Sequence, residues 1–532
     1  MSEMTTYSAP DAATGSVAGQ ILAKPREDFH VVFVRAPIVS TKGAVNNEAT
    51  PPLALAFLGG YLKQKGYRVT IVDGIGLGLN RYWDWEKRAG FWCQGASFED
   101  IRSAIPKDAD LLAFTCMFSG EWPLNRDLIQ FIRQHFPEVP TIAGGEHITA
   151  LPEYSLRDCS ALDFAALGEG EHLLFEFCER VRQKLPITLA GVHSLNENGE
   201  YQNSGDFPRI DEVDAIPWPN WDIAKLDPYW NAHKSYGISS YRDMPLMVSR
   251  GCPYKCTFCS NPKMWTTKYI LREVDDVLDE IESYIKKYQI TSLQFYDLTA
   301  ITKKSWTLEF CRKMIERGIN IKWSLPSGTR SEALDKEVLP LLAKTQCTYL
   351  VYAPESGSKT TLELIKKRVK LDVLNDSVRE AKRLGMVLRS NLIIGFPHET
   401  RKLLFETIFY GWKLAFMGVD EVSINIFSPY PGSEIFDNIY AENKIRINDD
   451  YFYALTSLNS DYTKFNPLTF CKYIGPKELA FYRIFFMLSN YFISYVFFPR
   501  RIIRSLKNIF SGKEATTVFE HRFQDLLKRL FK

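Results

Sequence analysis

The strongest constraint on the fold is an alternation of short strands and helices between residues 245 and 436. Apolar runs with the length of strands are separated by segments with the periodicity of amphipathic helices. Such regular alternation is typical of parallel βα units and favours a barrel-like sheet. The expected strands lie at 245–250, 290–297, 321–327, 348–356, 388–397 and 421–431.

Polar residues and a glycine follow these expected strands. In a barrel of βα units, the chemistry gathers at the carboxyl ends of the strands. Asp297, Arg330, Glu355 and Gly395 lie at or just beyond the ends of the second to fifth strands, and the first strand leads into a cysteine-rich loop, 250–262. We therefore expect these residues to meet at one mouth of the barrel.

The loop holds Cys252, Cys256 and Cys259, whereas the other seven cysteines are scattered, several within apolar runs. Clustered cysteines in a reduced compartment indicate a metal rather than a disulfide. A structural zinc needs four ligands, and no further Cys or His follows closely. An iron–sulfur cluster held by three thiolates would leave one iron open to an outside ligand. A zinc site completed by a distant residue is the alternative.

The N-terminal third shows a second alternation, with expected strands at 29–37, 68–74, 109–120, 140–147 and 163–171. This pattern predicts an open, doubly wound α/β domain that binds ligands beyond the carboxyl ends of its strands. No G-x-G-x-x-G follows the first strand, so a dinucleotide is not expected. Glycines at strand ends let the backbone approach a large ligand closely. The residues at these ends are Pro37, Ser119, Gly144, Gly145, His147, Thr149, Gly168 and Glu169.

Residues 245–436 resemble the radical S-adenosylmethionine (SAM) superfamily. The similar elements are "CPYKCTFC", with Phe258 before its third cysteine, "APESGS", "NLIIGFPHET" and "PYPGSEIFD". The resemblance implies a partial (β/α)6 TIM barrel, a [4Fe–4S] cluster on the three cysteines, and SAM on the open iron, cleaved to a 5′-deoxyadenosyl radical. The family's paired acidic residues are replaced here by "YDL", and ordinary ion pairs are the alternative for the charged positions. The SAM contacts that it implies are Phe258, Asp297, Arg330, Glu355 and Gly395.

The N-terminal region resembles the cobalamin-binding domain that precedes many radical SAM barrels, through "PPLALAFLGGYLKQKGY", "AGGEHITALPE" and "ALGEGE". The Asp-x-His-x-x-Gly motif that ligates cobalt elsewhere is absent, so the resemblance implies base-off cobalamin without a histidine ligand. His147 is assigned to the cofactor tail, with a packed structural histidine as the alternative. A domain that binds nothing is the second alternative. The cobalamin contacts that it implies are Ser119, Gly144, Gly145, His147, Thr149, Gly168 and Glu169.

The expected organisation is a disordered tail (1–24), a Rossmann-like cobalamin-binding domain (25–205), a Pro- and Trp-rich linker (206–240), the barrel (241–440) and a C-terminal helical region (441–532). In that last region an aromatic apolar run, 478–498, precedes a basic one, 499–532, which has nine Lys or Arg against three Asp or Glu. This pattern predicts either contact with a membrane surface or a helical cap on the barrel. Arg483, Ser489 and Asn490 argue against a spanning helix.

These features predict a cobalamin-dependent radical SAM enzyme that methylates an unactivated carbon of a small-molecule or lipid-like substrate. Oxidation or cyclisation with the same cofactors, as in the anaerobic cyclase of bacteriochlorophyll synthesis, is the first alternative, and a cobalamin sensor with a silent barrel is the second. A one-electron donor such as flavodoxin or ferredoxin is expected. A net charge of +2 gives no general attraction to nucleic acid. We expect a cytoplasmic protein, at the inner face of the membrane if the C-terminal region binds lipid.

Overall fold

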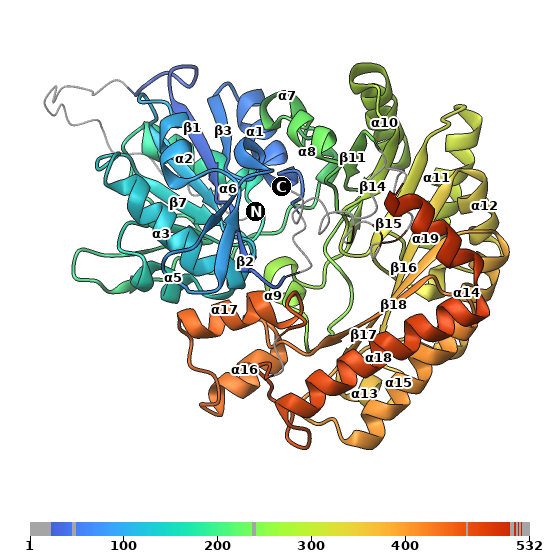
Figure 1. The fold of residues 1–532 in the computed structure, drawn as a ribbon. Helices are drawn as coiled ribbons and strands as arrows, with labels where there is room; N and C mark the ends of the chain where they lie inside the picture. The colour runs from blue at the N-terminus through green and yellow to red at the C-terminus, as the bar shows by residue number, and fades with distance from the viewer. Residues whose placement is uncertain are drawn as a thin grey trace, which may run out of the picture.

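The computed structural model describes residues 23–44, 49–236, 241–463 and 466–510, together with residues 515, 517, 520 and 523. The expected disordered tail, residues 1–24, lies outside these residues except for its last two positions. Figure 1 shows two α/β halves side by side, the N-terminal half in blue to cyan and the barrel half in green to orange.

The N-terminal half is built on a seven-stranded sheet in the order β10-β9-β8-β7-β6-β1-β3. The five strands from β8 to β3 are parallel, and β9 and β10 are antiparallel additions at one edge. The strands are β1 (His30–Arg35), β3 (Arg68–Asp73), β6 (Leu111–Thr115), β7 (Thr141–Gly144), β8 (Phe164–Ala166), β9 (Val192–Leu195) and β10 (Tyr201–Gln202). The helices are α1 (Leu53–Gln64), α2 (Phe98–Ala104), α3 (Trp122–Arg133), α4 (Glu146–Ala150), α5 (Pro152–Asp158) and α6 (Glu171–Arg182).

A small antiparallel sheet that the sequence patterns did not predict lies beside this domain. It consists of β2 (Ile38–Thr41), β5 (Phe91–Gln94) and β4 (Tyr82–Asp84). Two features explain why it was missed. The segment between β4 and β5 is charged, and the strands of this sheet have only three or four residues, which is too few to show a periodicity. The side chain of Cys93 on β5 is fully buried.

The barrel half has six parallel strands in chain order, β11-β14-β15-β16-β17-β18, with no pairing between the first and the last. This confirms the partial barrel. The strands are β11 (Asp243–Leu246), β14 (Ser292–Phe295), β15 (Lys322–Thr329), β16 (Cys347–Glu355), β17 (Val387–Ile394) and β18 (Glu421–Ile426). The helices are α10 (Val274–Tyr288), α11 (Lys304–Glu316), α12 (Val338–Lys344), α13 (Lys359–Leu364), α14 (Leu371–Arg383) and α15 (Arg401–Phe416).

The two faces of the barrel strands differ in chemistry, because successive side chains of a strand point to opposite faces. On β17, Leu388 and Leu392 belong to the large apolar core that includes the surrounding helices. Arg389 and Asn391 lie on the other face, toward the interior of the barrel, where Ser423 of β18 donates a hydrogen bond to Asn391 (2.8 Å). The interior wall at β17 and β18 is therefore polar.

The segment expected as a linker is ordered where it is described and contains η3 (Val213–Ala215), α7 (Trp221–Ala224) and α8 (Asp227–Ala232). Trp218 donates a hydrogen bond to Asp276 on α10 (3.0 Å), and Trp230 donates one to the carbonyl of Asp243 (2.7 Å). These contacts hold both tryptophans against the barrel half.

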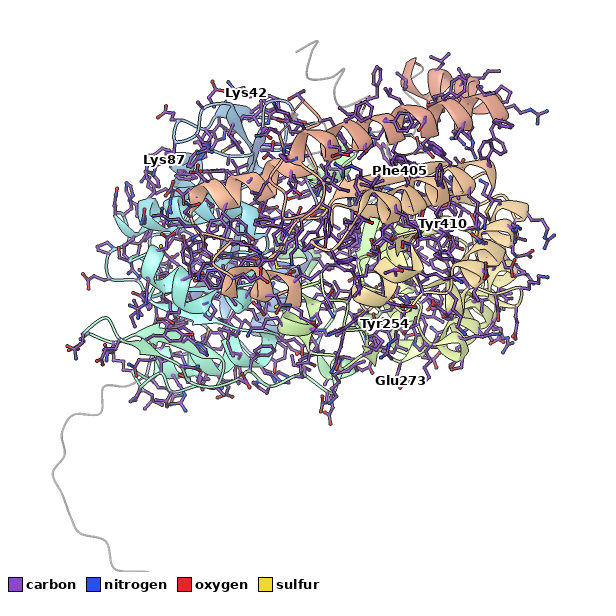
Figure 2. All side chains as sticks on the ribbon, turned by 90° about the horizontal axis from the view of Figure 1, so that it is seen from below. Lys42, Lys87, Tyr254, Glu273, Phe405 and Tyr410 are labelled. Carbon is purple, nitrogen blue, oxygen red and sulfur yellow. The ribbon has the colours of Figure 1, made fainter. Side chains whose placement is uncertain are left out.

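In the described part of the chain, the barrel is followed by α16 (Glu434–Ala441), α17 (Asp449–Leu458), α18 (Pro476–Phe497) and α19 (Arg500–Phe510). In Figure 1, α17 lies below the N-terminal half and α18 runs across the barrel half. Arg126 of α3 binds both carboxylate oxygens of Asp449 at 2.9 Å, so α17 joins the two halves. Figure 2 shows Phe405 and Tyr410 on α15, and the ring of Phe405 contacts Tyr482 of α18.

Candidate cofactor site

The cysteine loop lies between two short strands that pair with each other, β12 (Ser249–Arg250) before it and β13 (Ile270–Leu271) after it. The expected first strand, 245–250, is thus split into β11 and β12. Gly251 has φ +85°, and a Cβ there would lie 2.2 Å from the carbonyl oxygen of Lys268, so only glycine fits this turn. The turn directs residues 252–259 away from the strand and into a loop.

The three clustered cysteines are partly exposed, and none forms a disulfide. A closed zinc site needs several ligands around one ion, and within the described residues no three His, Cys, Asp or Glu side chains form such a group. In a cubane each thiolate binds a different iron. Three thiols spread along one partly exposed loop therefore fit a [4Fe–4S] cluster with one open iron.

Two cations face these thiols, and only one of them was expected. Burial raises the pKa of Cys256, whereas the charges of Lys367 and Arg330 lower it. The Arg330 guanidinium lies 3.9 Å from the centre of the Tyr254 ring, and Lys367 forms an ion pair with Glu355 (2.9 Å). These cations would offset the negative charge of a thiolate-bound cluster. Sequence reasoning missed Lys367, because it lies in the run "KKRVK", which resembles any solvated basic turn.

Asp297 is buried and is bound to the strand that precedes the loop. Its carboxylate accepts hydrogen bonds from the backbone of Val248 (3.0 Å), the backbone of Ser249 and the Ser249 hydroxyl (2.6 Å). Burial raises the pKa of Asp297 to about 6, and these hydrogen bonds oppose the rise. The structure thus gives Asp297 a role in fixing β12, and its direct contact with SAM stays a prediction.

Phe258 and Gly395 lie at the same mouth of the barrel. The Phe258 ring contacts Phe396 (centroids 5.9 Å apart). Gly395 has φ +85°, and its N–H donates to Glu399, whose carboxyl group is buried. Burial raises the pKa of Glu399 to about 8. The elements "CTFC" and "IIGFPHET" are therefore brought together as expected.

At the carboxyl edge of the N-terminal sheet, most of the expected side chains are bound within the protein. His147 is fully buried and stacks on Trp122, and its ring nitrogens contact the hydroxyls of Ser119 (3.0 Å) and Ser155 (3.2 Å). Thr149 donates to the Gly145 carbonyl (2.9 Å). The structure therefore places Ser119, His147 and Thr149 in a network that shapes the edge, and their contact with cobalamin stays a prediction.

The three expected glycines at this edge have different surroundings. A Cβ on Gly145 would lie 2.6 Å from the Cys116 carbonyl, and one on Gly168 would lie 2.0 Å from the Phe207 ring. Both residues have positive φ. Gly144 has room for a Cβ, with its nearest neighbour at 3.6 Å. Gly145 and Gly168 are thus required by the fold itself, and Gly144 alone leaves space at the edge.

Glu169 belongs to a buried ionic cluster that joins the two halves of the molecule. Its carboxylate binds Arg209 of the linker (2.6 Å) and Arg250 of β12 (3.0 Å), and Arg250 also binds Glu171 (2.5 Å). All four side chains are 7% exposed or less. Sequence reasoning assigned Glu169 to cofactor contact and missed the other three. The cluster fixes Arg250, at the start of the cysteine loop, to the segment that follows β8 in the N-terminal domain.

Comparisons with known proteins agree with this geometry. Residues 246–410 match the Radical SAM superfamily model, and residues 43–177 match the B12 binding domain model. An uncharacterized methyltransferase of Pyrococcus horikoshii is 26% identical over 90% of this chain and 94% of its own length. The anaerobic magnesium-protoporphyrin IX monomethyl ester cyclase of Rubrivivax gelatinosus is 24% identical over 94% of this chain and 84% of its own.

A solved structure shares the fold. The radical SAM methyltransferase TsrM from Kitasatospora setae, with cobalamin and a [4Fe–4S] cluster bound, has a TM-score of 0.58 at 16% identity and covers 78% of this chain and 75% of its own. The B12 binding domain model precedes the Radical SAM model along the chain, and the relatives align over most of both chains. Together with the three-cysteine loop at the barrel mouth, these findings lead to one assignment. The chain belongs to the radical SAM enzymes with an N-terminal cobalamin-binding domain, whose cofactors are a [4Fe–4S] cluster, SAM and cobalamin.

Proposed function

We propose that this enzyme transfers a methyl group to an unactivated carbon of a small-molecule substrate. The observation that carries the proposal is the buried cluster of Glu169, Glu171, Arg209 and Arg250, which holds the domain that matches the B12 binding model against the cysteine loop. When bound, the cofactors supply a 5′-deoxyadenosyl radical and a methyl group. The protein's own residues bind and orient: Lys367 and Arg330 balance the charge of the thiolates, and Asp297 holds β12.

The test is an anaerobic assay with trideuteromethyl-labelled SAM, hydroxocobalamin, a reductant and an extract of lipids and polar metabolites. We expect 5′-deoxyadenosine together with a product that is heavier by one labelled methyl group. A product that has only lost hydrogens would instead support cyclisation or oxidation, which the cyclase-like relative favours. No cleavage of SAM would contradict both activities and leave the sensor alternative.

The electron donor and the location are part of the same proposal. We assign the one-electron step to a small redox protein such as flavodoxin or ferredoxin, which should replace the chemical reductant in this assay. All ten cysteines are free, which supports a reducing compartment and hence the cytoplasm.

The C-terminal helices support a second part of the proposal, contact with a membrane surface. Among the described residues, α18 is the one helix long and apolar enough to cross a membrane, and a third of its apolar window is buried in the protein. Its polar residues Arg483, Asn490 and Ser494 face the protein, whereas Leu488 and Phe492 are each 69% exposed. One side of α18 thus packs against the protein, and the other side presents an apolar face. This arrangement is compatible with both predicted alternatives, a helical cap on the barrel and contact with a membrane surface.

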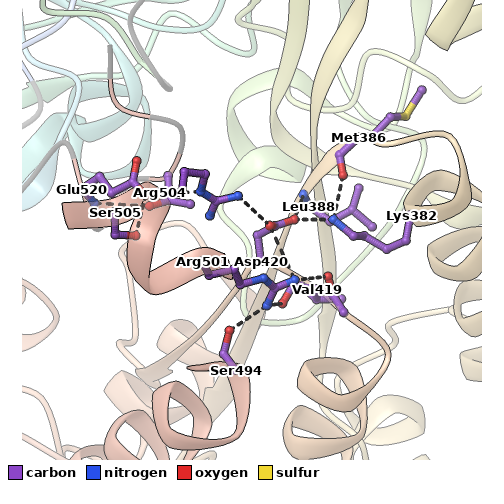
Figure 3. Close-up of polar contacts among 12 residues, drawn as sticks. Lys382, Met386, Leu388, Val419, Asp420, Ser494, Arg501, Arg504, Ser505 and Glu520 are labelled. Atoms are coloured by element: carbon purple, nitrogen blue, oxygen red, sulfur yellow. Dashed lines mark hydrogen bonds and ion pairs between the residues drawn. The ribbon is translucent and has the colours of Figure 1, made fainter. Parts of the chain in front are cut away.

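The apolar face of α18 continues onto its neighbours α15 and α19. Its members are Phe409, Phe416, Phe481, Phe485, Leu488, Phe492, Val496, Phe497, Ile502, Ile503 and Leu506, and all of them are exposed. The basic residues of α19 have two roles. Figure 3 shows Arg501 and Arg504 directed at Asp420, and Arg501 also donates to the carbonyls of Gly418 and Val419. Arg500 is exposed and is suited to lipid headgroups.

We expect the protein to float with anionic liposomes at low salt, and the double variant Leu488→Asp/Phe492→Asp to stay in solution. Each large apolar side chain contributes about 1.5–3 kcal/mol on burial, so the two changes should weaken binding about 100-fold or more. Leu364→Asp, which alters an exposed leucine on α13, is the matched control and should still float. If the parent protein stays in solution at low salt, the face binds something other than lipid.

A further inference from the structure

The cysteine loop and one neighbouring turn of the barrel carry charge of a single sign. Neither the loop, 250–263, nor the turn, 365–370, contains Asp or Glu. Because the whole chain has a net charge of only +2, this concentration is a local feature and does not follow from the composition. The cations of the two segments are Arg250, Lys255, Lys263, Lys366, Lys367, Arg368 and Lys370.

The fold places the turn directly against the cysteine loop. The backbone N–H of Thr257 donates a hydrogen bond to the Ile365 carbonyl (3.0 Å). Arg330, whose guanidinium lies over the Tyr254 ring, also donates to the Arg368 carbonyl. Two contacts, one at the start of the turn and one in its middle, therefore hold it beside the three thiols.

Some of the charge in the turn is balanced within the protein. Lys367 forms an ion pair with Glu355 (2.9 Å), and its charge acts on the Cys256 thiol. Lys366 forms an ion pair with Glu434 at the surface (2.6 Å). These two cations are thus accounted for by contacts inside the molecule.

Three other cations are not balanced in this way. Lys255, Arg368 and Lys370 are exposed. Neither the carboxylates that flank the turn, Glu363 and Asp372, nor any other described residue forms an ion pair with them. Unbalanced surface charge of one sign raises the rate at which oppositely charged partners associate. The three side chains therefore form a basic surface, suited to a partner with a negative face.

We infer that the basic surface of Lys255, Arg368 and Lys370 is where the electron donor docks, and that the donor is a small carrier protein with acidic side chains around its redox centre. The charge of the surface steers such a protein to this place. Cys252 and Cys256, beside the surface, are partly exposed, so the path from the donor to the cluster is short.

The transfer itself moves one electron from the donor to the cluster. No bond forms or breaks, and no proton moves. The inference rests on the one-electron step of the proposed function, and it adds the docking surface and the charge of the partner.

The test measures how fast reduced flavodoxin, an acidic carrier, reduces the cluster of the reconstituted holoenzyme in anaerobic stopped-flow absorbance. The variant is Arg368→Glu/Lys370→Glu, and Lys255 is kept because it lies between two cluster ligands. We expect the second-order rate constant to fall about tenfold at low salt, because steering is lost. The difference should disappear at about 1 M salt, where the Debye length is about 3 Å.

Lys286→Glu/Lys344→Glu is the matched control, since it changes the charge by the same amount. Both lysines are exposed and lie in the last turns of α10 and α12. Helices that connect parallel strands run opposite to those strands, so these last turns lie at the other end of the barrel from the cysteine loop. The rate with flavodoxin should match that of the parent.

Photoreduced deazariboflavin, a small uncharged reductant, separates docking from a change in the cluster. It should reduce the parent and both variants at equal rates, and their iron contents should be equal. Three results would overturn the inference: equal rates with flavodoxin in the two double variants, a parent rate that does not fall as salt is added, or a slower reaction with deazariboflavin in Arg368→Glu/Lys370→Glu alone. Reduction of the cluster requires no substrate, so failure of this inference differs from failure of the proposed methyl transfer, which the labelled-SAM assay measures.

Discussion

Replacing Cys256 with alanine is expected to abolish both the [4Fe–4S] cluster and the cleavage of SAM. Three thiolates hold three irons, so removal of one thiolate leaves a second iron of the cluster without a protein ligand. The loss should be complete in the iron content, in the visible absorbance of the reconstituted protein and in the yield of 5′-deoxyadenosine.

Cys347→Ala is the matched control for this result. Cys347 lies on β16, is buried in the apolar core and forms no disulfide. Its loss should leave the cluster and the SAM cleavage as in the parent. Retention of both properties by Cys256→Ala would remove the basis of the radical SAM assignment.

Arg250→Ala is expected to destabilise the protein by about 3–5 kcal/mol, the usual result when one partner of a buried ion pair is removed. The change leaves Glu171 buried without its guanidinium, and it leaves Glu169 with the Arg209 guanidinium and the Ile210 N–H. Burial raises the pKa of Glu171, but Arg250 outweighs burial and the pKa is lowered overall. Arg250→Lys keeps the charge but loses the planar fork, so an intermediate effect is expected.

Denaturant unfolding of the holoenzyme checks this prediction, with Arg157→Ala as the control. Arg157 pairs with Glu153 at the surface, where both side chains are about half exposed, so its loss should cost less than about 1 kcal/mol. A second measurement separates coupling of the domains from stability alone. Pulsed dipolar spectroscopy between cob(II)alamin and the reduced cluster should give a broader distance distribution in Arg250→Ala. Equal unfolding midpoints and equal distributions in Arg250→Ala and Arg157→Ala would show that the ionic cluster does not hold the halves together.

The fold class and the cofactors could be predicted because their signals are local. Strand–helix alternation and the C-x3-C-x2-C spacing each lie within a short window of sequence, and the structure and the comparisons confirm the partial barrel, the Rossmann-like domain and the cofactor set. Even the order of the barrel strands follows the chain. Sequence patterns of this kind record periodicity and spacing along the chain rather than distance in space.

What could not be predicted depends on contacts between distant segments. Glu169 follows a strand and was therefore assigned to the cofactor, but its carboxylate turns toward Arg250, 81 residues away. His147 was assigned to the cofactor tail for the same reason, and Trp122 and two serines enclose it. Arg483 interrupts an apolar run, and only the position of α18 against the Leu458 carbonyl (2.7 Å) shows why an arginine is accommodated there. In each case a polar group finds a partner that no local window contains.

The central claim is that three thiolates leave one iron of the cluster open and that SAM occupies it. The most direct measurement is the electron paramagnetic resonance spectrum of the reduced holoenzyme with and without saturating SAM. We predict a shift in the g values when SAM is added, because a new ligand alters the electronic environment of that iron. An unchanged spectrum at saturating SAM would contradict the claim and indicate a cluster whose four irons are all ligated by the protein.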